Sequence, residues 1–174
     1  MLKRDRRDKM TGLLDPWRPP RDARYDKPEF HPEDDVPWLA SPLPADALFV
    51  RLDIASLRRV NDAQGMVAGD DVIVAAAAAL AKAAPPWPVF RVVGGEFLVA
   101  ARFARRREAT AFVEMLRSAV VAAGGPNMRA GAAMAWPDDT AGLLFRTAGD
   151  ALTAAQRDGA RGVYVVASEK GSRR

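Results

Sequence analysis

Hydrophobic positions after residue 46 fall into two kinds of pattern, which predict alternating strands and helices. Short, nearly continuous apolar runs are typical of buried strands, and they occur at residues 47–54, 89–93, 96–103, 128–136 and 162–168. Longer segments with helical spacing predict helices at residues 56–64, 68–84, 106–122 and 139–158. In the second of these helices we expect Asp70 and Asp71 to lie in the first turn, where the helix dipole favours acidic side chains.

Two adjacent glycines separate the strands predicted at residues 89–93 and 96–103. Gly94 and Gly95 can supply the positive φ that a tight hairpin turn demands. The hairpin makes that pair of strands antiparallel, although strands and helices alternate elsewhere. The mixture predicts an α+β fold in which one sheet is flanked by helices, closer to a ferredoxin-like sandwich than to a doubly wound sheet.

The first 45 residues differ from the rest in composition. Eight of the 13 prolines lie between Pro16 and Pro44, and interior prolines interrupt long helices. We therefore predict a largely irregular N-terminal segment over residues 1–45, a domain over residues 46–168 and a basic tail over residues 169–174. Aromatic side chains would hold the first segment against the domain, and disorder over part of it is the alternative; they are Trp17, Tyr25, Phe30 and Trp38.

Composition narrows the function classes. A chain of 174 residues with 49% hydrophobic residues suits one globular domain, and its longest apolar run is too short to cross a membrane. No secretory signal is visible, so we expect a cytoplasmic protein without a membrane partner. There is no cysteine and one histidine, so a metal would need oxygen ligands, as Mg²⁺ does. The net charge of +4 comes mainly from the chain ends and one helix start, which does not favour a nucleic-acid partner.

Four separated segments resemble, in order and spacing, the motifs of GGDEF domains, the bacterial fold that condenses GTP into cyclic di-GMP. The first is DKMTGLLD at residues 8–15, and the second runs from Asp53 through Asn61-Asp62 to Gly69-Asp70. The third is RVVGGEF at residues 91–97, and the last is AGDALTAAQRDGARGVYVV at residues 148–166. The resemblance implies a nucleotidyl-cyclase-like sandwich with a central, mostly antiparallel five-stranded sheet.

The resemblance also implies roles for individual residues. Asp53, with the carbonyl of Ile54, would bind Mg²⁺ when a nucleotide is present, and Arg58 would contact phosphate. Asn61 and Asp70 would read the guanine edge, since an amide and a carboxylate together complement its donors and acceptors. Structural roles remain as alternatives: Asp53 would cap a turn, Asn61 would end a helix and Asp70 would cap the next helix.

The signature turn departs from the family pattern. Read without a gap, it is Val93-Gly94-Gly95-Glu96-Phe97, so Gly95 falls where the family has its second metal-binding acid. In a gapped alignment Glu96 would be that acid and the catalytic metal ligand. The ungapped alignment is preferred because it leaves Phe97 and Val99 on one face of the strand, and a one-residue shift would reverse the faces.

Other family positions are also changed. The last helix and its turn lack the family's acidic, aromatic and basic residues, which implies weaker triphosphate binding; the residues found there are Gly149, Thr153, Gln156 and Ala160. The inhibitory site for cyclic di-GMP is not expected, because its positions hold Ala84 and Trp87.

These departures predict a degenerate GGDEF domain without cyclase activity. We expect a regulatory or interaction module in cyclic di-GMP signalling that retains at most weak GTP binding and has a protein partner, for example another GGDEF-type domain in a homo- or heterodimer. One alternative is a slow diguanylate cyclase that works as a dimer. The other is a structural protein-interaction domain that binds no nucleotide.

Overall fold

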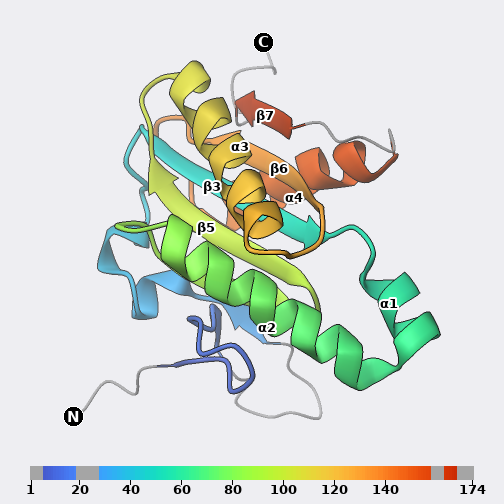
Figure 1. The fold of residues 1–174 in the computed structure, drawn as a ribbon. Helices are drawn as coiled ribbons and strands as arrows, with labels where there is room; N and C mark the ends of the chain where they lie inside the picture. Colours follow the sequence, from blue (N-terminus) through green and yellow to red (C-terminus); the bar gives the residue numbers. More distant parts are fainter. Residues whose placement is uncertain (1–5, 19–27, 158–162, 168–174) are drawn as a thin grey trace.

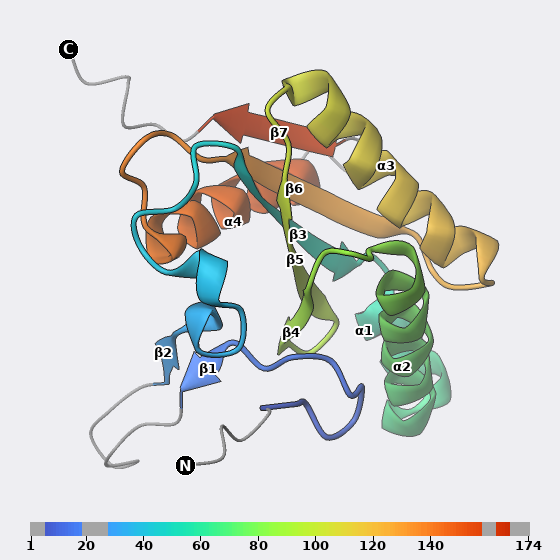
Figure 2. The same ribbon diagram turned by 90° about the vertical axis from the view of Figure 1, so that its left-hand side faces the viewer.

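The computed structural model describes residues 6–18, 28–157 and 163–167. A central sheet separates two layers (Figures 1 and 2): two helices cover one face, and a third helix with the N-terminal segment covers the other. The strands of the sheet are β3 (Ala47–Ile54), β4 (Val89–Val93), β5 (Glu96–Arg102), β6 (Met128–Met134) and β7 (Val163–Ala167).

The sheet has the order β4-β5-β3-β6-β7. β3 lies at the centre and pairs antiparallel with both β5 and β6, and β4 pairs antiparallel with β5. Among the strand pairs of this sheet that the structure describes, β6–β7 alone is parallel. The prediction of a mostly antiparallel five-stranded sheet is therefore confirmed, as is the hairpin at Gly94-Gly95.

Residues on alternate sides of each central strand build two separate cores, because side chains of a strand point to opposite faces. Leu48, Val50 and Leu52 of β3 are buried under α2 (Met66–Ala83) and α3 (Arg106–Ala122). Phe49, on the other side of β3, is buried under α4 (Ala141–Arg157) and the N-terminal segment. By the same alternation Arg51 and Asp53 face the α4 side.

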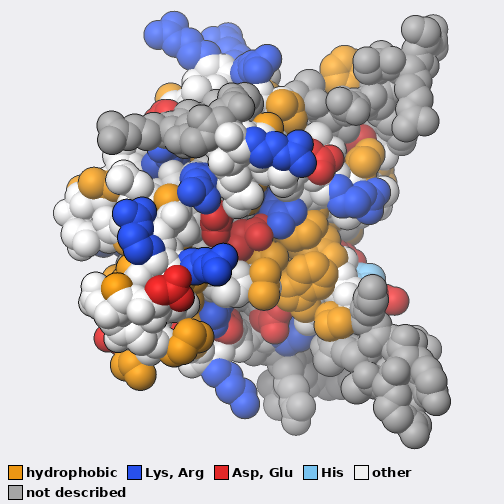
Figure 3. Space-filling model, turned by 90° about the vertical axis from the view of Figure 1, so that its right-hand side faces the viewer, with side chains coloured by type: hydrophobic (Ala, Val, Ile, Leu, Met, Phe, Trp, Pro, Cys, Tyr) orange, Lys and Arg blue, Asp and Glu red, His pale blue; other side chains and the backbone are white. Residues whose placement is uncertain are grey.

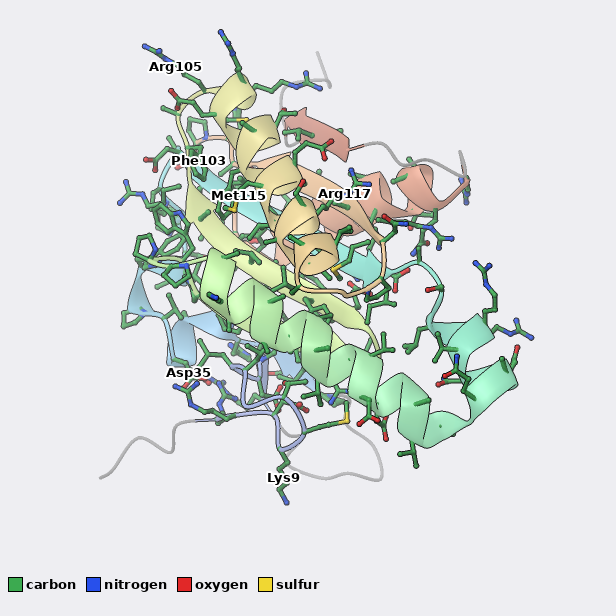
Figure 4. The ribbon with its side chains drawn as sticks, viewed as in Figure 1. Lys9, Asp35, Phe103, Arg105, Met115 and Arg117 are labelled. Carbon is green, nitrogen blue, oxygen red and sulfur yellow. The ribbon has the colours of Figure 1, made fainter. Side chains whose placement is uncertain are left out.

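Helix α3 is held at two places along its length. In its first half, the Phe112 ring lies 5.0 Å from the ring of Phe103, the residue that follows β5. Further along, the Nε of Arg117 donates a hydrogen bond to the carbonyl of Met128 in β6 at 2.8 Å; Figure 4 labels Phe103 and Arg117 at these two places.

The junction of α1 (Leu57–Gln64) and α2 lies at Gly65, which has φ 87°. Only glycine adopts this conformation readily. Since α2 begins at Met66, Asp70 and Asp71 do not lie in its first turn, and that expectation is wrong. Asp70 is not a helix cap and Asn61 lies inside α1, so the structural roles considered for both residues are also wrong.

The described part of the N-terminal segment packs into the domain. It contains β1 (Trp17–Arg18) paired with β2 (Glu29–Phe30) and two short 3-10 helices, Pro32–Asp34 and Pro37–Leu39. Four of its apolar side chains are buried in the two cores; these are Leu13, Val36, Leu39 and Leu43. Tyr25 and residues 169–174 lie outside the described residues, and the domain boundaries remain predictions.

An ion pair joins this segment to the signature hairpin. Arg91 of β4 donates from Nη1 to both carboxylate oxygens of Asp8, at 2.9 and 3.0 Å. Its Nε also donates to the carbonyl of Gly94 at 3.1 Å. One guanidinium therefore contacts both the first motif and the turn of the third motif.

Because Leu39 is fully buried, Leu39→Ala should lower the free energy of unfolding by about 2–5 kcal/mol. Urea denaturation followed by fluorescence measures this change. Val121→Ala is the control, because that side chain is half exposed and its loss should change stability by less than about 0.5 kcal/mol. Equal, small effects of both substitutions would show that the N-terminal segment contributes little to the core.

Candidate functional site

Two acidic side chains face each other at one end of the sheet. Asp53 of β3 and Glu96 of β5 are direct cross-strand partners, and both point to the α4 side. On the face in Figure 3, acidic side chains lie in the middle, basic side chains surround them, and hydrophobic side chains gather beside them. The end of β3, which carries Asp53 and Ile54, is where the sequence predicted a metal site.

The carboxylate of Glu96 is bound by a basic residue of the neighbouring strand. Arg51 forms a salt bridge with Glu96, and the side chains of both residues are only 17% exposed. The guanidinium of Arg51 also lies over the ring of Phe145, 4.2 Å from its centroid, and donates to the Phe145 carbonyl at 3.3 Å. Arg51 is therefore fixed by three contacts, from a carboxylate, an aromatic face and a backbone oxygen.

Burial raises the pKa of Glu96 above its usual value, because the charged form loses water. The positive charge of Arg51 and its hydrogen bond oppose this shift, whereas the nearby negative charge of Asp53 adds to it. The same arginine thus offsets the cost of placing two carboxylates next to each other.

Gly149 of α4 leaves the space that Arg51 occupies. A Cβ atom at residue 149 would lie 2.1 Å from Nη1 of Arg51 and 3.0 Å from its Cζ. No side chain fits there while the guanidinium keeps its position. The departure from the family's acid at this place is therefore matched by an arginine that fills the gap.

Among the described residues, two side chains contact the carboxylate of Asp53. The side-chain amide of Gln156 donates to Oδ2 of Asp53 at 3.1 Å, and Nη1 of Arg129 lies 3.7 Å from the same oxygen. Burial nevertheless raises the pKa of Asp53, and the bond from Gln156 and the charge of Arg129 oppose the shift only in part. Gln156, the second departure in the last helix, therefore binds the carboxylate that the sequence assigned to a metal.

The signature turn brings no third acid to this site. Gly94 adopts φ 53°, and the carbonyl of Gly95 accepts a hydrogen bond from the amide of Ile54 at 3.2 Å. A Cβ at residue 95 would lie 2.8 Å from Cδ2 of Leu57 and 3.1 Å from Cδ1 of Ile54. Phe97 is fully buried on the α2 side, so Glu96 points to the α4 side.

The residues predicted to read guanine lie at the contact between α1 and α2. The side-chain oxygen of Asn61 is buried, has no hydrogen-bond partner among the described residues, and lies against Gly69, where a Cβ would be only 1.7 Å away. Asp70, the next residue, is exposed. Arg58 is 96% exposed and lies 3.8 Å from Asp62 on its own helix, so it extends away from the rest of the site.

This donor set does not fit the Mg²⁺ pair that the resemblance implies. Glu96 is bound by Arg51, and Asp53 by Gln156 and Arg129, so nearby cationic groups oppose a further cation. Within the described ranges, no three acidic or imidazole side chains come together as metal ligands. The predicted ligands Asp53 and Ile54 therefore lie together at the end of β3 without a complete metal site.

Arg51 and Arg129 were missed by sequence reasoning. A signal for Arg51 was present, because a residue two positions before Asp53 on the same strand must share its face. Arg129 lies near the start of β6, which is distant in sequence, and the β3–β6 register places it beside Asp53. No pattern in a single sequence fixes such a register.

Comparison with known proteins identifies the fold. No protein-family model and no curated protein matches the chain. The structure matches the GGDEF domain of DgcB from Caulobacter crescentus, solved in complex with c-di-GMP, over 94% of this chain and 96% of that chain, with 23% identity and a TM-score of 0.71. It also matches diguanylate cyclase SiaD from Pseudomonas aeruginosa, solved with its activator SiaC, over 91% of this chain, with 22% identity and a TM-score of 0.71.

A third similar structure is a segment of LapD from Vibrio cholerae that comprises an S helix, a GGDEF domain and an EAL domain. It matches 97% of this chain with 16% identity and a TM-score of 0.74. This chain spans 61% of the SiaD chain and 38% of the LapD chain. The predicted fold, that of GGDEF domains, is confirmed. Among the described helices, none combines the length and apolar character needed to cross a bilayer.

Gly149→Ala should lower the free energy of unfolding by about 1–3 kcal/mol, although alanine favours helices, because Arg51 must leave its position. Gly142→Ala in the same helix is the matched control. Its Cβ would meet nothing closer than 3.8 Å, so it should be neutral or raise stability by up to about 1 kcal/mol. The same two substitutions are then made in an Arg51→Ala protein. Because the guanidinium is absent there, Gly149→Ala should no longer lower the free energy of unfolding. An undiminished cost there would contradict the contact.

Asp53→Asn should become more stable relative to the unsubstituted protein as pH rises from about 4. The pKa of folded Asp53 is raised above 3.8, so the folded state holds the proton longer than the unfolded state. The unsubstituted protein therefore loses stability as pH increases through this window, and asparagine does not titrate. Chemical denaturation at a series of pH values measures the difference, and the opposite slope would contradict a raised pKa.

Proposed function

We propose, on the premise that this chain has the GGDEF-domain fold, that it is a catalytically inactive domain of this kind that serves cyclic di-GMP signalling through binding. The observation that carries the proposal is that both carboxylates have partners within the chain: Arg51 for Glu96, and Arg129 and Gln156 for Asp53. Phosphoryl transfer needs cations to offset the charge of the triphosphate. Here the carboxylates that would hold such cations are already bound within the chain.

Restoring the missing acid meets a steric obstacle that supports the same conclusion. A side chain at residue 95 would require Leu57 and Ile54 to move. It would also enter the α2 side, where Ile54 is buried, whereas Asp53 and Glu96 face the α4 side. A single substitution of Gly95 by an acid is therefore not expected to restore activity.

Guanine nucleotide binding is the second part of the proposal, and we expect it to be weak. With the Asn61 oxygen buried, its amide nitrogen is the group that would donate to guanine O6 or N7, while the Asp70 carboxylate would accept from N1–H and the amino group. Arg58 is too exposed to hold a phosphate firmly. Binding would therefore rest on the base and not on the triphosphate.

A role in a complex is supported by the kinds of protein that share the fold. SiaD was solved with an activator protein, and DgcB with c-di-GMP. A domain that binds without turnover can serve as such a partner. We place it in the cytoplasm, where GTP and cyclic di-GMP signalling proteins meet.

Calorimetric titration of Mg·GTP into the purified protein tests this function, with Mg·ATP as the control nucleotide. We expect guanine-selective binding with a dissociation constant of roughly 0.1–1 mM and no continuing heat. Asn61→Ala should weaken GTP binding about tenfold. Gln64→Ala, an exposed substitution on the same helix, should leave it unchanged.

Product analysis of the same samples separates the alternatives. Accumulation of cyclic di-GMP that is lost in Asp53→Asn would establish a slow cyclase and overturn the proposal. Absence of any binding at millimolar GTP would instead favour an interaction domain that uses no nucleotide.

A further inference from the structure

Helix α2 exposes an apolar face that nothing in the described structure covers. Its buried side packs on the sheet through residues such as Ile73, Ala76 and Leu80. On its outer side Val67 is 76% exposed and Val74 is 41% exposed. Exposed apolar side chains that lie together on one helix mark a candidate contact surface.

The outer face also carries charge at its two ends. Asp71, Ala75, Ala78 and Lys82 are all exposed and follow one another at intervals of four, three and four residues, which places them in one line along the helix. The acid lies toward the N-terminal end of the line, the base toward the C-terminal end, and two alanines lie between them. Small side chains at the centre permit close approach of a second helix.

We propose that a second copy of this chain docks on this face, with the two α2 helices antiparallel across a twofold axis between residues 76 and 77. Such an axis places Ala75 opposite Ala78 of the second copy. It also places Asp71 opposite Lys82 of the second copy, twice by symmetry. The charge pattern is thus complementary to itself in the antiparallel arrangement, as an isologous interface requires.

A hollow beside Asp71 can receive the lysine of the proposed Asp71–Lys82 ion pair. It measures about 390 Å³ and is lined by Asp71 together with the apolar side chains of Val60, Val72, Ala75 and Pro126. A lysine fits such a hollow, because its aliphatic stem can lie on apolar walls while the ammonium reaches the carboxylate. Lys82 of the second copy supplies that side chain.

The inference does not depend on the proposed function. Asp53 and Glu96 lie on the opposite face of the sheet, so pairing through α2 leaves this acidic pair uncovered. The interface lies closer to Asn61 and Asp70, because their sequence neighbours Val60 and Asp71 line the hollow.

Sedimentation equilibrium on the full chain tests the proposal through charge reversal. The unsubstituted protein should dimerise at concentrations of about 100 μM or below. Asp71→Lys and Lys82→Asp should each raise the dissociation constant of the dimer by at least about tenfold, because each places like charges opposite each other. The double substitution Asp71→Lys with Lys82→Asp should restore dimerisation.

Asp150→Lys is the matched control, since it makes the same charge change on the exposed side of α4, and it should leave the dimer intact. A protein that is monomeric throughout this range overturns the proposal. So does a dimer that survives both single substitutions, or a double variant that remains monomeric while still folded by circular dichroism.

Cross-linking gives a second, geometric readout, because the chain contains no cysteine. Ala78→Cys should be joined efficiently by a short bis-maleimide reagent in the dimer. Thr153→Cys, on the exposed side of α4, should not. Equal cross-linking of the two variants would place the interface elsewhere and overturn the antiparallel α2 arrangement.

Discussion

The contact between the Arg51 guanidinium and the Glu96 carboxylate determines the electrostatics of this site. It brings a fixed positive charge to the place where two strands present Glu96 and Asp53 side by side. Two adjacent carboxylates of low exposure would otherwise repel each other or require a bound cation. Stacking on Phe145 holds the guanidinium in place, so the chain itself provides the countercharge.

Several departures from the family pattern become one structural change when seen around this contact. Gly149 gives Arg51 its space, and Gln156 binds the oxygen of Asp53 that the sequence assigned to a metal. Gly95 removes a third carboxylate and packs against Leu57. In sequence these positions are scattered over 60 residues or so, and each looks like an isolated loss. In the structure Gly149 and Gln156 belong to one site, where both carboxylates have partners within the chain.

Much of the fold follows from the sequence for physical reasons. Apolar runs such as residues 47–54 and the paired glycines of the hairpin are local signals, and the expected strands and helices were found there. Helix starts were less predictable: α2 begins at Met66 because Gly65 adopts a positive φ, which no periodicity reveals. The site was predictable only in part, because Asp53 carries a motif whereas Arg129 reaches it through strand register. The burial of the N-terminal segment likewise depends on contacts between residues far apart in sequence, such as Asp8 with Arg91.

Titration with Mn²⁺, followed by electron paramagnetic resonance of the free ion, tests most directly the claim that both carboxylates are engaged within the chain. The account predicts no saturable Mn²⁺ binding below about 1 mM in the unsubstituted protein, because the carboxylates already have basic or amide partners. It predicts measurable binding in Arg51→Ala, where Glu96 and Asp53 lose the countercharge between them. Stoichiometric binding to the unsubstituted protein that Asp53→Asn abolishes would contradict it.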